Sequence, residues 1–426
     1  MRKKETEVLR DLQYYKFSAY GFLKNLRFFD PFIILFFRQT GMSFLEIGTL
    51  VSIREIATTV LEVPTGFVAD AYGRKNAMIF AFLSYIISFL VFYFLPSFLL
   101  YAIAMVFFAM GEAFRTGTHK AMIMDYLKSR ELSHLKVQYY GSTRGWSQVG
   151  SAVSALVAGA LVFYSGGYRI VFLASVVPYL GGLLLMASYP SILNVHRRTE
   201  REAGFLKGIL RNIVETTSGF LDIFRNRNAI RALFNSSLYD GLFKTVKDYL
   251  QPILRDFALA LPVLAVLGEQ RSTILISLTY FILYLLTAVS SRNAHRFVRK
   301  FRSLGTAINA GFLLGVMLTV MAGILFDIDL KILTIMIFIL LHIAMNFRRP
   351  MLVSYVSEYI DTRIMATGLS VESQLKTVCV ALFAPLMGLI ADLADIGVGI
   401  IVLAGLLLVL FPLIRVSRAG RADRTA

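Results

Sequence analysis

The sequence predicts an all-α membrane protein with twelve transmembrane helices in two pseudo-symmetric six-helix bundles. Hydrophobic residues make up 57% of the 426-residue chain and charged residues only 17%, a balance that soluble proteins of this length do not have. Apolar runs near or above the ~20 residues that a helix needs to cross the hydrocarbon recur along the whole chain. An arginine followed ten residues later by an acid-tyrosine pair occurs once in each half of the chain, and this repeat predicts the two bundles.

The apolar runs give the order of the elements. We expect spans, with ends placed to within a few residues, at approximately 14–38, 44–68, 76–95, 97–125, 138–164, 169–190, 228–257, 271–292, 303–326, 328–359, 366–391 and 395–415. The first bundle then covers 14–190 and the second 228–415. A cytoplasmic tail at 1–13 precedes them, and a basic cytoplasmic tail at 416–426 follows.

Residues 191–227 form the longest connection between predicted spans. It begins with basic residues and continues with apolar residues at helical spacing, which predicts an amphipathic helix on the membrane surface or on the bundle. The apolar positions are Phe205, Ile209, Ile213, Phe220 and Phe224. This cytoplasmic linker divides the chain into two halves of six spans.

The two halves share an internal repeat. In the fourth span Arg115 follows a phenylalanine, and an acid-tyrosine pair begins ten residues later at Asp125. In the tenth span Arg348 also follows a phenylalanine, and the same distance leads to an acid-tyrosine pair at Glu358. The identical spacing indicates two parallel halves related about the membrane normal.

The connection between the second and third spans carries a specific motif. Gly66, Asp70, Gly73, Arg74 and Lys75 follow the pattern Gly-x-x-x-Asp-x-x-Gly-Arg-Lys. This pattern resembles the loop motif between helices 2 and 3 of the major facilitator superfamily (MFS). The chemistry fits, because Gly66 lets a helix end approach a neighbour and Gly73 permits a tight turn with positive φ. Asp70 suits a helix N-terminus, and Arg74 and Lys75 hold the loop on the cytoplasmic side.

The resemblance covers nearly the whole chain and implies a secondary active transporter with the MFS fold. Spans 1, 4, 7 and 10 would line a central cavity, and spans 3, 6, 9 and 12 would face lipid. The motif and further charged residues of the spans would act as a conformational gate. The gate candidates are Gly66, Asp70, Gly73, Arg74, Lys75, Asp125, Arg144 and Glu358.

The distribution of Lys and Arg predicts the orientation. Basic residues are concentrated in the tails and in the loops of one face, for example at Arg74 and Lys75 and again at Arg197, Arg198 and Arg201. By the positive-inside rule this face is cytoplasmic. We therefore expect an integral protein of the cytoplasmic (inner) membrane with both termini in the cytoplasm.

Charged side chains recur inside the predicted spans, although each costs about 2.5–3.5 kcal/mol near the bilayer centre unless it has a partner or a wet cavity. The apolar centres of spans 3, 6, 9 and 12 carry none, and these are the spans that the resemblance places against lipid. The candidates for substrate binding or ion coupling are Lys24, Asn25, Arg27, Asp30, Glu112, Arg115, His119, Asp240, Lys244, Asp248, Asn346 and Arg348.

Two interpretations of the arginines stay open. Arg115 could pair with Glu112 or Glu62, and Arg348 with Glu372, as bridges of a cytoplasmic gate. Alternatively, at least one arginine binds an acidic group of the solute, because a guanidinium stays protonated when buried and offers a planar fork to a carboxylate or phosphate.

Other chemistry is not indicated. The sequence contains no Walker A motif, no Rossmann glycine run and no HExxH motif. Its five histidines are scattered and its single cysteine, Cys379, lies in a predicted span, so we expect no enzyme, no cofactor and no metal site. His119 and His342 either titrate during a transport cycle or serve helix packing.

Basic residues outnumber acidic residues within the spans, and a positive cleft concentrates anions. We therefore expect transport of a small polar organic solute, anionic or zwitterionic, with protons as the candidate coupling ion. The alternatives are multidrug or siderophore-type efflux, a lipid flippase of the same fold, and a non-transporting membrane receptor or scaffold. The expected partners are the solute and the lipid bilayer, without nucleic acid, and the expected state is a monomer.

Overall fold

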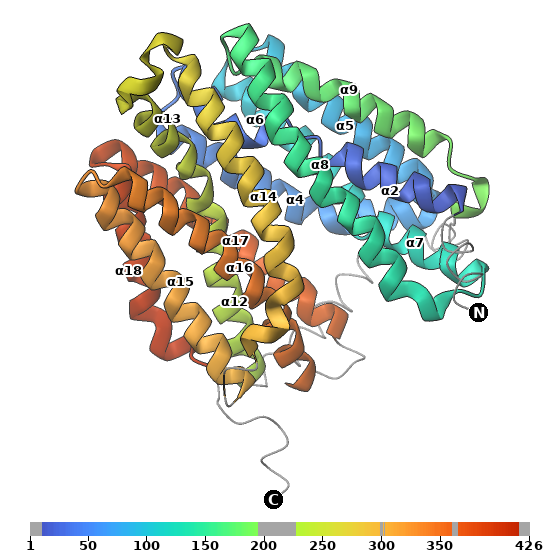
Figure 1. Cartoon of the computed structure of the whole chain (residues 1–426). Helices are drawn as coiled ribbons and strands as arrows, with labels where there is room; N and C mark the ends of the chain where they lie inside the picture. Colours follow the sequence, from blue (N-terminus) through green and yellow to red (C-terminus); the bar gives the residue numbers. More distant parts are fainter. Residues whose placement is uncertain (1–10, 195–226, 299–300, 302, 360–364, 417–426) are drawn as a thin grey trace, which may run out of the picture. The chain divides into compact units, whose positions relative to one another are not determined.

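The computed structural model describes residues 11–194, 227–298, 301, 303–359 and 365–416, and all regular secondary structure in these ranges is helical (Figure 1). The amphipathic helix expected within the linker lies outside the described residues, as does most of each predicted tail.

Contacts divide the chain into two compact units. The first unit comprises Met1–Phe32, Ala57–Asn212 and Ser277–Tyr284, and the second comprises Ile33–Ile56, Ile213–Ile276 and Leu285–Ala426. The division does not fall at the linker alone, because helices α4 (Phe44–Tyr72) and α14 (Gln270–Val298) each contribute to both units. The arrangement in two six-helix bundles therefore stays a prediction.

The first unit is built around buried aromatic rings. Besides part of α4, its long helices are α2 (Leu12–Lys24), α5 (Arg74–Phe94), α6 (Phe98–Arg115), α7 (Thr118–Ser129), α8 (Lys136–Ser165) and α9 (Ile170–Ala187). Helix α5 packs against α6 and α9, and α2 packs against α8 and α9. Tyr85 and Tyr179 meet edge to face in the core, with ring centroids 5.2 Å apart, which fixes the helices around them.

The second unit has a mainly aliphatic core. Besides parts of α4 and α14, its helices are α3 (Ile33–Gln39), α12 (Arg227–Val246), α13 (Leu250–Ala260), α15 (Leu304–Asp327), α16 (Lys331–Tyr359), α17 (Met365–Leu393) and α18 (Ile396–Ile414). Helix α15 packs against α16 and α18, and α12 packs against α17. One buried cluster includes Ala229, Leu233, Ile308, Met351 and Tyr355.

Seven helices of the described part of the chain are long and apolar enough to cross a membrane. They are Arg74–Phe94, Phe98–Ser129, Tyr139–Ser165, Ile170–Ala187, Leu304–Asp327, Ser370–Leu393 and Ile396–Ile414. Each coincides with a span expected from the sequence, which confirms an integral membrane protein. The full count of twelve spans stays a prediction.

Three expected spans are interrupted rather than continuous. The span expected at 14–38 breaks after α2, and a short 3-10 turn then carries Pro31. The span expected at 228–257 breaks at a second 3-10 turn ahead of Pro252. In both places the proline lacks the N–H of a regular helix and crowds the preceding turn, which favours a break there. The span expected at 97–125 bends at Gly117, whose φ of +77° a glycine adopts without strain.

Candidate functional site

A cluster of charged side chains forms in the first unit around Glu112, near the end of α6. Its carboxylate accepts from Arg27 through one oxygen and from Arg115 through the other. Arg27 comes from the segment that follows α2, and Arg115 lies one turn after Glu112 on α6. The three side chains are 18–22% exposed.

Two further charges stand near this cluster. Lys24, at the end of α2, interacts electrostatically with Arg27, Arg115, Glu112 and Asp30. Within the described part of the chain Lys24 forms no ion pair. Three basic side chains thus lie near two carboxylates. We call Lys24, Arg27, Asp30, Glu112 and Arg115 the cation cluster.

Aromatic rings hold the cation cluster in place. Arg115 Nε donates to Tyr85 Oη at 3.2 Å, and the guanidinium of Arg27 lies 5.6 Å from the ring centre of Phe108. Tyr179 Oη donates to the carbonyl of Lys24 at 3.1 Å. These contacts make the arginines rigid, which lowers the entropy lost when they bind a ligand.

Two of the polar candidates near this cluster have structural contacts. Asn25 Nδ2 donates to the carbonyl of Gly21 at 2.7 Å and closes the end of α2. His119 stacks on Tyr20, with ring centroids 3.6 Å apart, and its Nε2 lies 3.4 Å from Tyr189 Oη. The geometry of His119 favours the packing interpretation over a titrating role.

The loop motif forms an ion-pair network in the first unit. Arg74 bonds Asp70, four residues earlier, at 3.2 Å and also pairs with Asp125 on α7. Gly73 has φ +103°, and Lys75 Nζ donates to the carbonyl of Tyr189 at 2.7 Å. The motif thus joins the α4–α5 turn to α7 and to the end of α9.

The other predicted gate residues contribute less. A Cβ at Gly66 would meet no described atom within 4 Å, so the expected close approach of a neighbour is not seen there. Arg144 is exposed on α8. The side chain of Glu358 lies outside the described residues, so the repeated acid of α16 stays a prediction.

A second charged group lies in the second unit and involves a residue that was not a predicted site residue. Glu55, whose side chain is 8% exposed, accepts from Arg54 at 3.1 Å and from Lys244 of α12 at 2.6 Å. Lys247 pairs with Asp248 in the turn after α12. Lys244 and Asp248 are therefore engaged in ion pairs, and the link from α4 to α12 joins residues almost two hundred positions apart.

The first half of α4 also lies unusually close to α17. A Cβ at Gly48 would stand 2.2 Å from the carbonyl oxygen of Ala384, and one at Gly388 would stand 2.1 Å from that of Phe44. The carboxylate of Asp392 accepts from the first amides of α4 at 2.7 and 2.9 Å. We call this glycine-mediated contact the α4–α17 seam. It depends on glycine at both positions because the opposing atoms belong to the backbone.

Arg348 lies on α16 in the second unit and is 2% exposed. Its Nη2 donates to the carbonyl and to Oδ1 of Asn235, whereas Glu372 accepts from Ser236. The expected bridge between Arg348 and Glu372 is therefore not formed. Asp240 of α12 interacts with Arg348 electrostatically.

The remaining polar candidates of α16 bond their own helix. Asn346 Nδ2 donates to the carbonyl of His342 at 2.7 Å, and His342 Nδ1 lies 2.8 Å from the carbonyl of Phe338. The ring of His342 meets Phe243 edge to face. Among the described residues no group of histidine, cysteine or acidic side chains has the arrangement of a metal site.

Comparisons with known proteins agree with the fold. The family model of the Major Facilitator Superfamily matches residues 21–375. The uncharacterized MFS-type transporter YxaM of Bacillus subtilis (strain 168) is 24% identical over 277 residues, which are 62% of this chain. The match spans only 65% of the length of that relative.

Solved transporter structures share the same fold. The nucleoside transporter NupG is 15% identical with a TM-score of 0.73, over 95% of this chain and 98% of that one. A D-xylose-proton symporter is 15% identical with a TM-score of 0.67, over 95% and 97% of the two chains. The peptide transporter POT in complex with sulfate is 12% identical with a TM-score of 0.67, over 94% of each chain.

Proposed function

Because the chain belongs to the Major Facilitator Superfamily, we propose that it is a secondary active transporter for a small organic solute with an acidic group. It would move this solute across the cytoplasmic membrane by alternating access, as a monomer with both termini in the cytoplasm. The fold alone does not select a solute, since solved proteins that share it include nucleoside, xylose and peptide transporters. Selection of the solute therefore depends on the charged side chains of this chain.

The cation cluster is the observation that supports an acidic solute. Glu112 is shared between Arg27 and Arg115, so its single carboxylate neutralises only part of their charge, and Lys24 is a third basic side chain beside them. A guanidinium fork binds a carboxylate or phosphate through two parallel hydrogen bonds, and partial burial strengthens such bonds. A solute anion here would compete with Glu112 for Arg115 and recruit Lys24.

We assign the switch between the inward-open and outward-open states to groups of contacts that form and break together. The Glu55–Lys244 pair and the α4–α17 seam hold the first half of α4 against α12 and α17. The Arg74 network holds the α4–α5 turn against α7. In this proposal they are gate contacts that break and re-form during the cycle. Where transport is proton-coupled, Asp30, Glu112 and Asp240 are the candidate acids for the proton.

Reconstituted protein is expected to accumulate acidic solutes selectively. Proteoliposomes with an imposed pH gradient would be given solutes in matched pairs, each a carboxylate and its carboxamide. We expect uptake of one or more carboxylates with their amides at least tenfold poorer. Arg115→Lys should raise the KM for the acid about tenfold or more, because a lysine loses the fork. Lys128→Gln, an exposed change on α7, is the matched control.

Two outcomes would contradict the proposal. Equal uptake of acid and amide would remove the acidic group from the recognition. No uptake of any pair with folded protein, in either direction of the gradient, would favour the receptor or scaffold alternative.

A further inference from the structure

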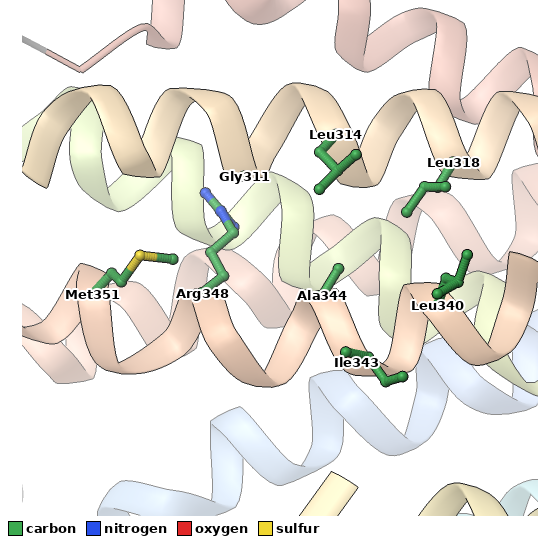
Figure 2. Close-up of a pocket in the computed structure, with 8 residues that line it drawn as sticks. All are labelled: Gly311, Leu314, Leu318, Leu340, Ile343, Ala344, Arg348 and Met351. Atoms are coloured by element: carbon green, nitrogen blue, oxygen red, sulfur yellow. The ribbon is translucent and has the colours of Figure 1, made fainter. Parts of the chain in front are cut away.

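A cavity of about 230 Å³ lies between α15 and α16 of the second unit (Figure 2). Leu314 and Leu318 of α15 and Leu340 and Ile343 of α16 form its apolar walls. Leu314 and Leu340 are 47% and 46% exposed. Exposed leucines beside a helix that is apolar enough to cross a membrane suit contact with lipid chains.

Arg348 is the one charged side chain among the eight residues that line this cavity. Figure 2 shows it reaching from α16 toward α15 beside Gly311. Its Cδ lies 3.9 Å from the position that a Cβ would take at Gly311. The guanidinium carbon is 4.3 Å from the ring centre of Tyr239 and 5.5 Å from that of Phe312.

The charge of Arg348 is only partly compensated. Burying a guanidinium is costly unless anions or well-placed dipoles replace the lost water. Asn235 supplies two acceptors to Nη2, and the two rings add cation–π attraction. Its Nε is buried without a hydrogen-bond partner, and no carboxylate bonds the side chain within the described ranges. Asp240 and Glu372 act on the guanidinium electrostatically without bonding it, so Nε is the donor left for an anion that enters through the cavity.

We propose that this cavity binds the anion of a long-chain fatty acid taken from the membrane. The alkyl chain lies between α15 and α16, and the carboxylate meets Arg348. The volume is below the ~300–1,000 Å³ of pockets that enclose drug-sized ligands, so it suits part of one chain and not two. This site shares no residue with the cation cluster, which belongs to the other unit.

The test uses the purified full chain and the fluorescent fatty acid cis-parinarate, whose emission rises on entering an apolar site. We expect saturable binding that oleate displaces and methyl oleate displaces at least tenfold less well. Gly311→Leu, which fills the cavity from α15, should weaken parinarate binding at least tenfold. Gly405→Leu is the matched control, since a Cβ at that position of α18 meets no described atom within 4 Å.

Arg348→Gln should weaken binding of parinarate by a similar factor and abolish the preference for oleate over its methyl ester. Gly311→Leu keeps the proposal testable if the Arg348 variant does not fold. Unchanged parinarate binding in folded Gly311→Leu protein would overturn the site. Equal displacement by oleate and methyl oleate would overturn the role of Arg348, and displacement by phosphatidylglycerol as strong as by oleate would overturn the single-chain ligand.

Discussion

Replacing Glu112 with glutamine is expected to destabilise the protein by about 3 kcal/mol and to stop transport. The change removes the carboxylate that pairs with both Arg27 and Arg115 and leaves two partly buried cations beside Lys24. Removing one charge of a buried ion pair destabilises a protein by more than the intact pair stabilises it, because the remaining charges stay desolvated without a partner. Chemical denaturation in detergent, with uptake in proteoliposomes, measures both effects.

Glu131→Gln is the matched control for that variant, because Glu131 is an exposed acid of the same unit. It should unfold at the denaturant concentration of the unmodified protein. Unfolding of Glu112→Gln at that same concentration would show that Glu112 does not organise the cation cluster.

Replacing Gly388 with leucine is expected to reduce transport more than tenfold while the protein still inserts into the membrane. A side chain at this position meets the backbone of Phe44 at 2.1 Å, and a backbone atom cannot rotate away. Overpacking of this kind costs about 1–3 kcal/mol, and it destabilises the conformation in which the α4–α17 seam is closed. The initial rate of solute uptake is the measurement.

The same substitution at Gly405 in α18 controls for the loss of a helical glycine, since that position has open space around it. Its uptake rate should match that of the unmodified protein. A normal rate in Gly388→Leu would mean that the seam need not close during transport.

The sequence predicts the class of fold because the signals are local. Apolar runs locate the seven confirmed spans, and the pattern around Asp70, Gly73 and Arg74 gives the family. The breaks within two of the expected spans are harder to predict. Pro31 and Pro252 stand at these breaks, but Pro64 and Pro178 lie inside helices that continue, so a proline alone does not locate a break.

The ion-pair partners of the charged side chains are harder to predict from the sequence, because pairing depends on which helices contact each other. Spacing along α6 offers Glu112 to Arg115, and the structure forms that pair. No local pattern joins Glu55 to Lys244, which are brought together only by the fold.

Contacts made by neutral groups are equally hard to predict from the sequence, because they also depend on the fold. The sequence suggests an acidic partner for Arg348, but in the structure its guanidinium bonds the oxygens of Asn235 and lies over the ring of Tyr239. The glycines of the α4–α17 seam lie far apart in sequence, and only the fold shows that their backbones touch.

The central claim is that Arg115 binds the acidic group of the solute and does not serve only as a structural partner of Glu112. The double variant Arg115→Glu with Glu112→Arg keeps the net charge and can re-form their ion pair in reverse. Side-by-side measurement of unfolding and of the KM for an accepted acid separates the two roles. Our account predicts stability recovered relative to Arg115→Glu alone, with uptake still absent. Recovery of uptake at an unchanged KM would remove Arg115 from the binding site and contradict the account.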